Sequence, residues 1–250
     1  MAQRKNIVII GATSAMAEHC ARLWLAEAAA DVTLIGRDTA RMEIIAADLR
    51  VRSPESSVTV VEGQFRDPVE IQGVIDAIRP GDPVDIALIA HGFLPDQEAG
   101  QNDLTLCRDA LEINAVSPAL YAEAFAARMM KSGYGTIIII GSVAGDRGRK
   151  SNYIYGSAKG LLNIYAQGLQ HRLAFTSIRV TLVKPGPTAT PMTARMKNAP
   201  KNMASVESVA RDIVRGADRG AAVIYTPAKW RLIMLIVRLV PNFLFHKTNL

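Results

Sequence analysis

Seven short apolar runs, each followed by a longer segment with helical spacing, constrain the fold of this chain more than any other feature. The runs are rich in β-branched residues and cover residues 6–10, 31–36, 57–62, 85–90, 136–141, 179–184 and 222–225. Helical spacing of apolar residues recurs in 15–28, 39–50, 69–78, 105–131, 153–173 and 206–216. This alternation predicts an α/β fold: a doubly wound, Rossmann-type parallel sheet of about seven strands with helices on both faces.

The length of the chain suits one domain of this kind. A sheet of this type built from 250 residues buries enough surface for a single core. We predict that residues 1–227 form the α/β domain and that residues 228–250 extend it as an apolar helical tail. Residues 187–200, rich in Pro, Thr and Met, follow the sixth strand and are placed to close over a ligand at the carboxyl ends of the strands.

The C-terminal tail is both apolar and basic. Residues 229–247 are largely apolar, and Arg231 and Arg238 lie seven apart on one helical face. Pro241 separates this helix from an aromatic tip at Phe245. Two interpretations are open: packing against the same subunit or a partner, and shallow insertion at a membrane surface, aided by the basic residues.

Charge and cysteine content exclude several classes of protein. The net charge is +6, but the Lys and Arg residues are scattered, so the continuous basic face of a nucleic-acid-binding protein is not expected. Cys20 and Cys107 lie in apolar helical patterns without the spacing of metal ligands. Since no cluster of histidines or carboxylates accompanies them in the sequence, we expect no metal site.

Targeting signals also bear on the expected location. The first strand begins so near Met1 that no room is left for a signal peptide. No apolar run reaches the roughly 18–20 residues of a spanning helix. We expect a cytoplasmic protein whose tail is the segment suited to peripheral contact with the inner face of the membrane.

A turn of small residues links the first strand to the first helix. Such a turn lets backbone N–H groups and the helix N-terminus approach a pyrophosphate. The candidate contacts are Gly11, Thr13, Ser14, Ala15 and Met16. Ala15 and Ala17 replace the second and third glycines of the usual pattern, so an ordinary strand-to-helix turn remains an alternative.

The residue after the second strand indicates which dinucleotide is preferred. Arg37 follows Gly36 at the position where an acidic side chain would favour NAD and a cation accommodates the 2′-phosphate of NADP. We therefore expect NADP(H) as the preferred cofactor and NAD as the alternative. A surface pair between Arg37 and Asp38 is the other interpretation of this arginine.

Three residues make a set sufficient for carbonyl chemistry. Ser142 follows the fifth strand, and Tyr155 and Lys159 lie four apart on the next helix, so both face one ligand. An adjacent ammonium and an oxidised nicotinamide would favour the phenolate of Tyr155 and lower its pKa. The Ser142 hydroxyl is suited to hydrogen-bond the substrate oxygen.

These motifs resemble those of the short-chain dehydrogenase/reductase family, and the resemblance covers residues 5–227. It implies that Ser142, Tyr155 and Lys159 are catalytic, that Lys159 also holds the nicotinamide ribose, and that Asn114 positions a water for proton relay. It further implies a set of cofactor contacts outside the glycine turn: Gln64, Phe65, Ala90, Gly92, Tyr155, Lys159, Pro185, Gly186, Thr188 and Thr190.

The chain departs from the family pattern after the fourth strand, where the usual Asn-Asn-Ala-Gly appears as Ile89-Ala90-His91-Gly92. His91 is expected to be a structural or pocket residue rather than a general base. Gln64 stands where an Asp usually meets the adenine amino group, and an amide can still accept that hydrogen bond. Tyr153, two residues before Tyr155, is expected to pack or to line the substrate pocket.

The sequence as a whole predicts an NADPH-dependent oxidoreductase that reduces a ketone to an alcohol, or catalyses the reverse. The tail also resembles that of a narrower group, the decaprenylphosphoryl-2-keto-pentose reductases, which implies a lipid-linked keto-sugar or another lipid-like substrate. The alternatives are a non-catalytic NADP-binding sensor or scaffold and a dehydratase or epimerase on the same fold. The family expectation for assembly is a homodimer or homotetramer built through residues 105–131 and 153–173.

Overall fold

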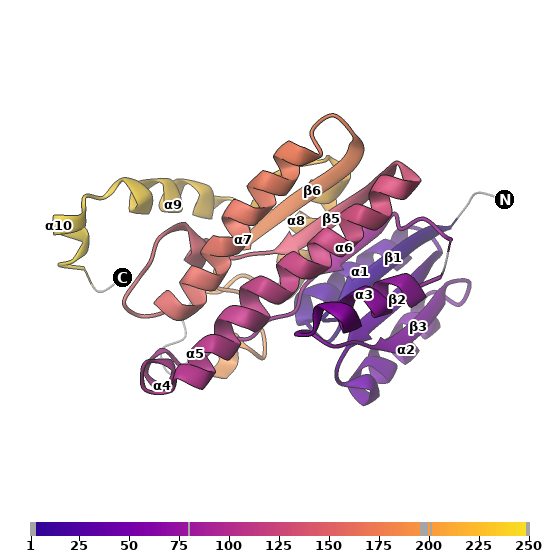
Figure 1. Ribbon diagram of the computed structural model, residues 1–250, viewed down its shortest axis with the longest axis horizontal. Helices are drawn as coiled ribbons and strands as arrows, with labels where there is room; N and C mark the ends of the chain where they lie inside the picture. Colours follow the sequence, from indigo (N-terminus) through magenta and orange to yellow (C-terminus); the bar gives the residue numbers. More distant parts are fainter. Residues whose placement is uncertain (1–3, 80, 196–199, 201, 249–250) are drawn as a thin grey trace.

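The apolar runs form one parallel sheet in the computed structural model, which describes residues 4–79, 81–195, 200 and 202–248 (Figure 1). Its strands are β1 (Lys5–Ile10), β2 (Ala30–Gly36), β3 (Ser57–Glu62), β4 (Ile86–Ile89), β5 (Tyr134–Ile140), β6 (Ser177–Pro185) and β7 (Val223–Thr226). They lie in the order β3-β2-β1-β4-β5-β6-β7, and each neighbouring pair is parallel. The predicted fold class is confirmed.

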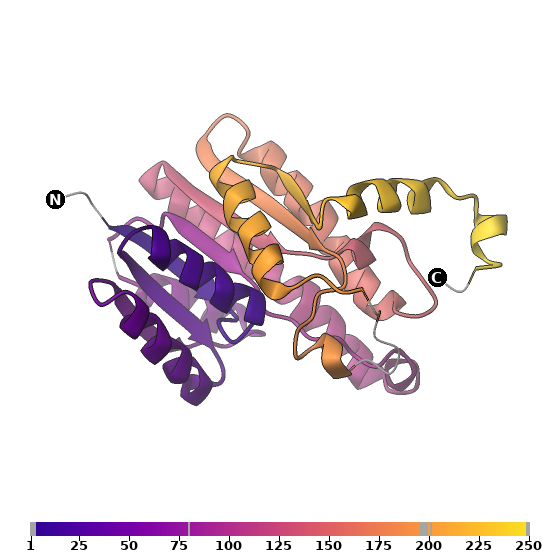
Figure 2. The same cartoon turned by 180° about the vertical axis from the view of Figure 1, so that it is seen from behind.

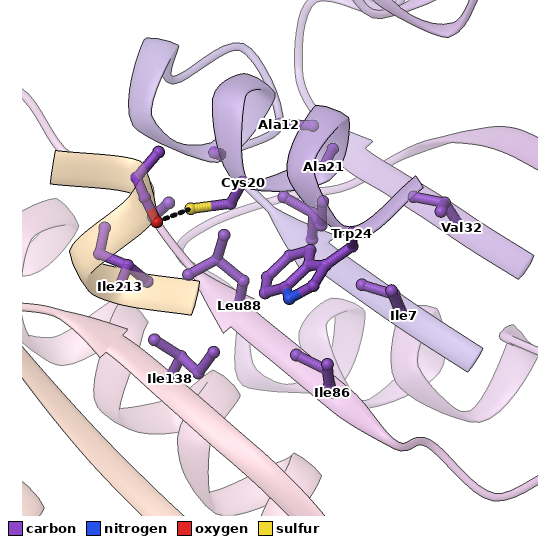
Figure 3. Packing of buried hydrophobic residues seen from close by; sticks show 14 of the residues in the cluster. Ile7, Ala12, Cys20, Ala21, Trp24, Val32, Ile86, Leu88, Ile138 and Ile213 are labelled. Carbon is purple, nitrogen blue, oxygen red and sulfur yellow. Dashed lines mark hydrogen bonds between the residues drawn. The ribbon is translucent and has the colours of Figure 1, made fainter. Parts of the chain in front are cut away.

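Helices cover both faces of the sheet (Figures 1 and 2). One layer contains α1 (Ala15–Glu27), α2 (Thr39–Arg52) and α8 (Val206–Asp218), and the other contains α3 (Pro68–Ala77), α6 (Ser117–Ser132) and α7 (Tyr153–Arg172). Alternate strand residues serve the two halves of the core: Ile7 packs with the first layer and Val8 with the second. Figure 3 shows the first half, where Leu88 lies between Trp24 of α1 and Ile213 of α8.

One predicted helix is interrupted in the structure. Residues 105–131 were expected to form a single helix, but α5 (Leu104–Leu111) and α6 are joined by a π-helical turn, η1 (Glu112–Val116), that contains Asn114. Pro118 lies four residues after Asn114 and has no N–H, so the α-helical hydrogen bond to the Asn114 carbonyl cannot form. A further short helix, α4 (Gln97–Asn102), was not predicted.

The strand order places the topological switch point of the sheet between β1 and β4. The chain builds outward from β1 to β3 and then crosses back to β4, so the connections after β1 and β4 leave the sheet in opposite directions. Ligands of open parallel sheets bind outside the carboxyl ends of the strands at such a point. The segments after β1, β2, β4, β5 and β6 therefore all lie at one end of the sheet, the end formed by the carboxyl ends of the strands.

The tail begins at the same end of the sheet, where two residues separate β7 from the first helix of the tail. It consists of α9 (Lys229–Leu239) and α10 (Asn242–Phe245), which extend beyond the sheet at one end of the molecule (Figures 1 and 2). In the part of the chain that the structure describes, no helix is long and apolar enough to cross a membrane. The predicted lid contains a short turn, η3 (Thr193–Arg195), while its residues 196–199 lie outside the described residues.

Candidate active site

The turn after β1 packs tightly against the end of β4. Gly11 has φ = +76°, and its N–H donates to the carbonyl of Ile35 at 2.8 Å. A Cβ at Gly11 would stand 2.5 Å from the backbone nitrogen of His91, so glycine is required both by conformation and by space. This close approach holds the start of α1 beside the carboxyl ends of β1 and β4.

The first turn of α1, with its backbone N–H groups, begins at the switch point between β1 and β4. Ser14 is the N-cap residue, and among the described residues its side chain makes no capping hydrogen bond. Thr13, Ser14, Ala15 and Met16 are half-buried, whereas Ala17 is buried in the core. The first N–H groups of a helix have no partner within the helix, so this half-buried turn is suited to bind an anion.

Arg37 lies at the carboxyl end of β2 above an aromatic ring. Its guanidinium carbon is 5.3 Å from the centroid of the Phe65 ring. The alternative pair with Asp38 is not formed, because the Asp38 carboxylate caps α2 by accepting from the backbone N–H of Arg41 at 3.0 Å. Within the described residues Arg37 has no ion-pair partner, so its charge is not neutralised by a carboxylate.

His91 is a neutral, packed residue. Its ring stacks on Phe65 with centroids 4.4 Å apart, and its Nε2 shares a hydrogen bond of 2.9 Å with the Ser117 hydroxyl. Burial lowers the pKa of His91 to about 3, and the nearby Lys159 and Arg37 charges act in the same direction. A histidine with so low a pKa is a weak base, and its burial and packing agree with the structural interpretation of this residue.

The Ser142 segment is fastened to the helix that carries Tyr155. Ser142 caps η2 (Val143–Asp146) by accepting from the backbone N–H of Ala144 at 3.1 Å. A Cβ at Gly145 would lie 2.5 Å from the carbonyl carbon of Lys159, so this loop rests directly on the backbone of α7. The close packing brings residues 13 positions apart in the sequence to one place.

Tyr155 and Ser142 are hydrogen-bonded to each other, and burial dominates the titration of the tyrosine. Burial raises the pKa of Tyr155 to about 12, and the hydrogen bond with Ser142 acts in the opposite direction. The lowering expected from Lys159 together with an oxidised nicotinamide stays a prediction. The phenol is protonated at neutral pH and so carries a proton that it can donate to a carbonyl oxygen.

Lys159 and Asn114 both lie close to Gly92. The Lys159 ammonium donates to the carbonyl of Ile140 at 3.0 Å and lies 5.7 Å from the centroid of the Tyr155 ring. A Cβ at Gly92 would be 2.6 Å from Asn114 Oδ1 and 3.7 Å from Lys159 Nζ. Burial lowers the pKa of Lys159 to about 8.

The Asn114 side chain is already committed to the backbone. Its Oδ1 accepts from the N–H of Phe93 at 2.9 Å, and its Nδ2 donates to the carbonyl of Ala110 at 2.9 Å. These bonds hold the segment after β4 against η1. The side chain thus braces the site, and any relay through Asn114 falls to its main-chain carbonyl.

Four residues predicted to contact the cofactor lie at the end of β6 and in the segment after it: Pro185, Gly186, Thr188 and Thr190. Gly186 continues the edge of the sheet by donating its N–H to Thr226, and Thr188 is buried with its hydroxyl donating to the Gly186 carbonyl at 2.9 Å. Thr190 is tied to Thr193, whose hydroxyl also donates to the Thr188 carbonyl at 2.6 Å. The sequence did not indicate this role of Thr193.

A residue of the tail forms a wall beside Gly186. A Cβ at Gly186 would lie 2.0 Å from Nε1 of Trp230, which places the indole of α9 directly on the Pro185–Gly186 segment. A cavity of about 270 Å³ lies here, lined by Pro187, Asn202, Met203, Ala204, Pro227, Lys229 and Trp230. Trp230 is a pocket residue that the sequence motifs did not identify.

A buried ion pair lies behind the Ser142 segment. The Asp146 carboxylate accepts from the Lys184 ammonium at 2.6 Å and from the Tyr225 hydroxyl at 2.8 Å, and both charged side chains are buried. Asn163 donates to the same carboxylate at 3.2 Å. This network joins η2 to β6, β7 and α7, and only the tertiary structure reveals it.

Arg147 fastens the tail to the same segment. Its guanidinium donates to the carbonyls of Val237 and Val240 at 2.5 Å and to Asn242 Oδ1 at 2.9 Å. The guanidinium carbon also stacks 3.8 Å from the centroid of the Phe245 ring. A cation at the C-terminal end of α9 is favoured by the helix dipole. Arg147 thus binds free carbonyl groups at the end of α9 and also orients α10.

Comparison with known proteins identifies the class that this fold and site define. The sequence profile of the short chain dehydrogenase family matches residues 5–201. An uncharacterized oxidoreductase of Streptomyces coelicolor is 30% identical over 250 residues, which cover 97% of this chain and 95% of that protein. This chain therefore belongs to the short-chain dehydrogenase family and is an oxidoreductase.

Solved structures share the fold over nearly the whole chain. A short-chain dehydrogenase from Sphingobium yanoikuyae, solved in complex with NADPH, has a TM-score of 0.82 at 24% identity and covers 95% of this chain and 97% of its own. A short-chain dehydrogenase from Burkholderia cenocepacia, solved in complex with NADP, has a TM-score of 0.79 at 19% identity, covering 96% and 99%. These relatives do not support the narrower resemblance to the decaprenylphosphoryl-2-keto-pentose reductases.

Proposed function

We propose that this chain is an NADPH-dependent reductase that converts a ketone to an alcohol. The observation that carries the proposal is the convergence of Ser142, Tyr155 and Lys159 at the edge of the sheet where the Gly11 turn and Arg37 also lie. The first turn of α1 fits the phosphates of NADP(H), and so does Arg37, which has no ion-pair partner among the described residues.

Each group at the site has a distinct task in the proposed reaction. NADPH supplies the hydride for the carbonyl carbon when it is bound. Tyr155 donates its phenolic proton to the carbonyl oxygen, and the Ser142 hydroxyl hydrogen-bonds that oxygen as negative charge develops on it. Lys159 holds the cofactor ribose and delivers the replacement proton, with the Asn114 main-chain carbonyl orienting a water on that path.

The charge of Lys159 predicts how the reaction depends on pH. Its pKa is lowered to about 8, so the ammonium is present below this pH and is lost as the pH rises through it. Tyr155, with its pKa raised to about 12, keeps its proton over the same range. We expect kcat/KM for NADPH, which reports the free enzyme, to be level at neutral pH and to fall above about pH 8.

A lysine-to-arginine variant provides the control for this profile. A guanidinium stays protonated throughout this pH range. The activity that remains in Lys159→Arg should therefore show no decline near pH 8. The same decline in the variant would assign it to another group.

Binding of the two dinucleotides tests the cofactor preference. Fluorescence titration should show tighter binding of NADPH than of NADH, and Arg37→Ala should lose about 1–3 kcal/mol of NADPH affinity with little change for NADH. Arg41→Ala, four residues further on, removes the same charge from α2 and should leave both affinities unchanged. Binding of neither nucleotide by the wild type would contradict the proposal, and binding without any turnover would favour a sensor or scaffold.

For the substrate we propose a lipid-like ketone, of which a lipid-linked keto-sugar is one candidate. The support is the apolar tail, whose first helix places Trp230 against Gly186 at the end of β6. Long-chain methyl ketones should then be reduced with a lower KM than short ones of the same head group. Equal KM values along a chain-length series would contradict this substrate class.

A further inference from the structure

The tail presents a continuous apolar stripe that faces away from the body of the protein. Leu232, Leu235, Ile236 and Leu239 occupy positions i, i+3, i+4 and i+7 of α9, and their side chains are 63%, 52%, 57% and 72% exposed. Met234, on the opposite face, is buried against the domain. Because one face of α9 is docked and the other is bare, the exposure is not the result of a detached helix.

The aromatic tip continues the stripe beyond the proline. Phe243 and Leu244 of α10 are 67% and 48% exposed, while Phe245 is held under the Arg147 guanidinium. The bonds from Arg147 to the end of α9 fix the direction in which α10 points. The exposed side chains of both helices thus belong to one ordered surface.

Cations border this surface, and no acidic residue interrupts it. Asp218 is the last Asp or Glu in the sequence, and the tail carries Lys229, Arg231, Arg238 and Lys247. At about 100° per residue, Arg231 and Arg238 project between the buried Met234 and the exposed stripe. Pairing of two such tails would bring like charges together, whereas anionic lipid headgroups would neutralise them.

We infer that α9 and α10 form a docking surface for an anionic lipid membrane, with the apolar stripe inserted shallowly and the bordering cations at the headgroups. The inference rests on the proposed function in one respect, because docking on a membrane would bring the proposed lipid-like substrate to the active site. The tail starts two residues after β7 and is fastened through Arg147 to the segment that carries Ser142. Docking therefore places the site edge near the membrane surface, from which an amphiphilic ketone can enter.

Vesicle co-sedimentation of the full chain tests the inference without turnover. The probes are vesicles of phosphatidylcholine alone and of phosphatidylcholine mixed with phosphatidylglycerol. The wild type should bind the anionic vesicles more tightly than the neutral ones, and added salt should weaken this binding. The double variant Leu232→Asp, Leu239→Asp should lose at least about ten-fold in affinity for the anionic vesicles.

A matched variant separates the stripe from exposed apolar residues in general. Ile44 and Val51 of α2 are likewise seven apart and are 72% and 80% exposed, so Ile44→Asp, Val51→Asp should bind as the wild type does. NADPH titration of each variant shows whether the nucleotide site is intact, which keeps failure of docking distinct from failure of the proposed function. The inference would be overturned if the wild type did not bind the vesicles, or if the α2 variant lost as much vesicle affinity as the stripe variant. It would also be overturned if the stripe substitutions turned an oligomer into a monomer and left vesicle binding unchanged.

Discussion

Replacing Tyr155 by phenylalanine is expected to lower kcat for ketone reduction by about 10²–10⁴-fold, the usual contribution of a general acid. The phenol is hydrogen-bonded to Ser142, and its pKa, raised by burial to about 12, lies well above neutral pH, so the proton is present for donation. Phenylalanine preserves the ring and its packing but has no proton to donate. NADPH binding should change little, so the loss should appear in kcat, measured by the consumption of NADPH with a long-chain methyl ketone.

The matched control is Tyr153→Phe. Tyr153 lies on the same first turn of α7, but it points to a different side of the helix, and its side chain is 43% exposed. This variant loses the same hydroxyl and should keep most of the activity. Full activity of Tyr155→Phe, or equal losses in the two variants, would show that the acid has been assigned to the wrong residue.

Replacing Asp146 by alanine is expected to destabilise the folded chain by about 3–5 kcal/mol, because it leaves the buried Lys184 ammonium without its counter-charge. The carboxylate also accepts hydrogen bonds from Tyr225 and Asn163, so the substitution leaves three donors without an acceptor. Urea-induced unfolding without nucleotide, followed by tryptophan fluorescence, measures the loss.

A surface ion pair provides the control for this loss. Glu43 lies 3.2 Å from Arg50 on α2, and both side chains are about half exposed. Glu43→Ala should cost less than about 1 kcal/mol, since water screens such a pair. A cost for Asp146→Ala as small as that of the surface variant would mean that the Asp146 network does not hold η2 in place.

Much of the fold was predictable because its signals are local. Strands buried on both faces require uninterrupted apolar runs such as residues 137–140, and the structure places them in the centre of the sheet. The break at η1 was missed because the residues from Leu104 to Ser132 keep helical spacing throughout. Pro118 was the available signal, since a proline removes the hydrogen bond to the residue four positions earlier.

The sequence by itself determined the alternation of strands and helices, the Gly11 turn, the cation at Arg37 and the four-residue spacing of Tyr155 and Lys159. Each depends on neighbouring residues and on backbone geometry, so a short window carries the information. Only the tertiary structure decided that Asp146 pairs with Lys184, that Arg147 fastens the tail, and that Trp230 lies on Gly186. Those contacts join segments that are 38 to 90 residues apart, or that meet only after the sheet has formed, and no local pattern encodes which distant side chains will share a buried space.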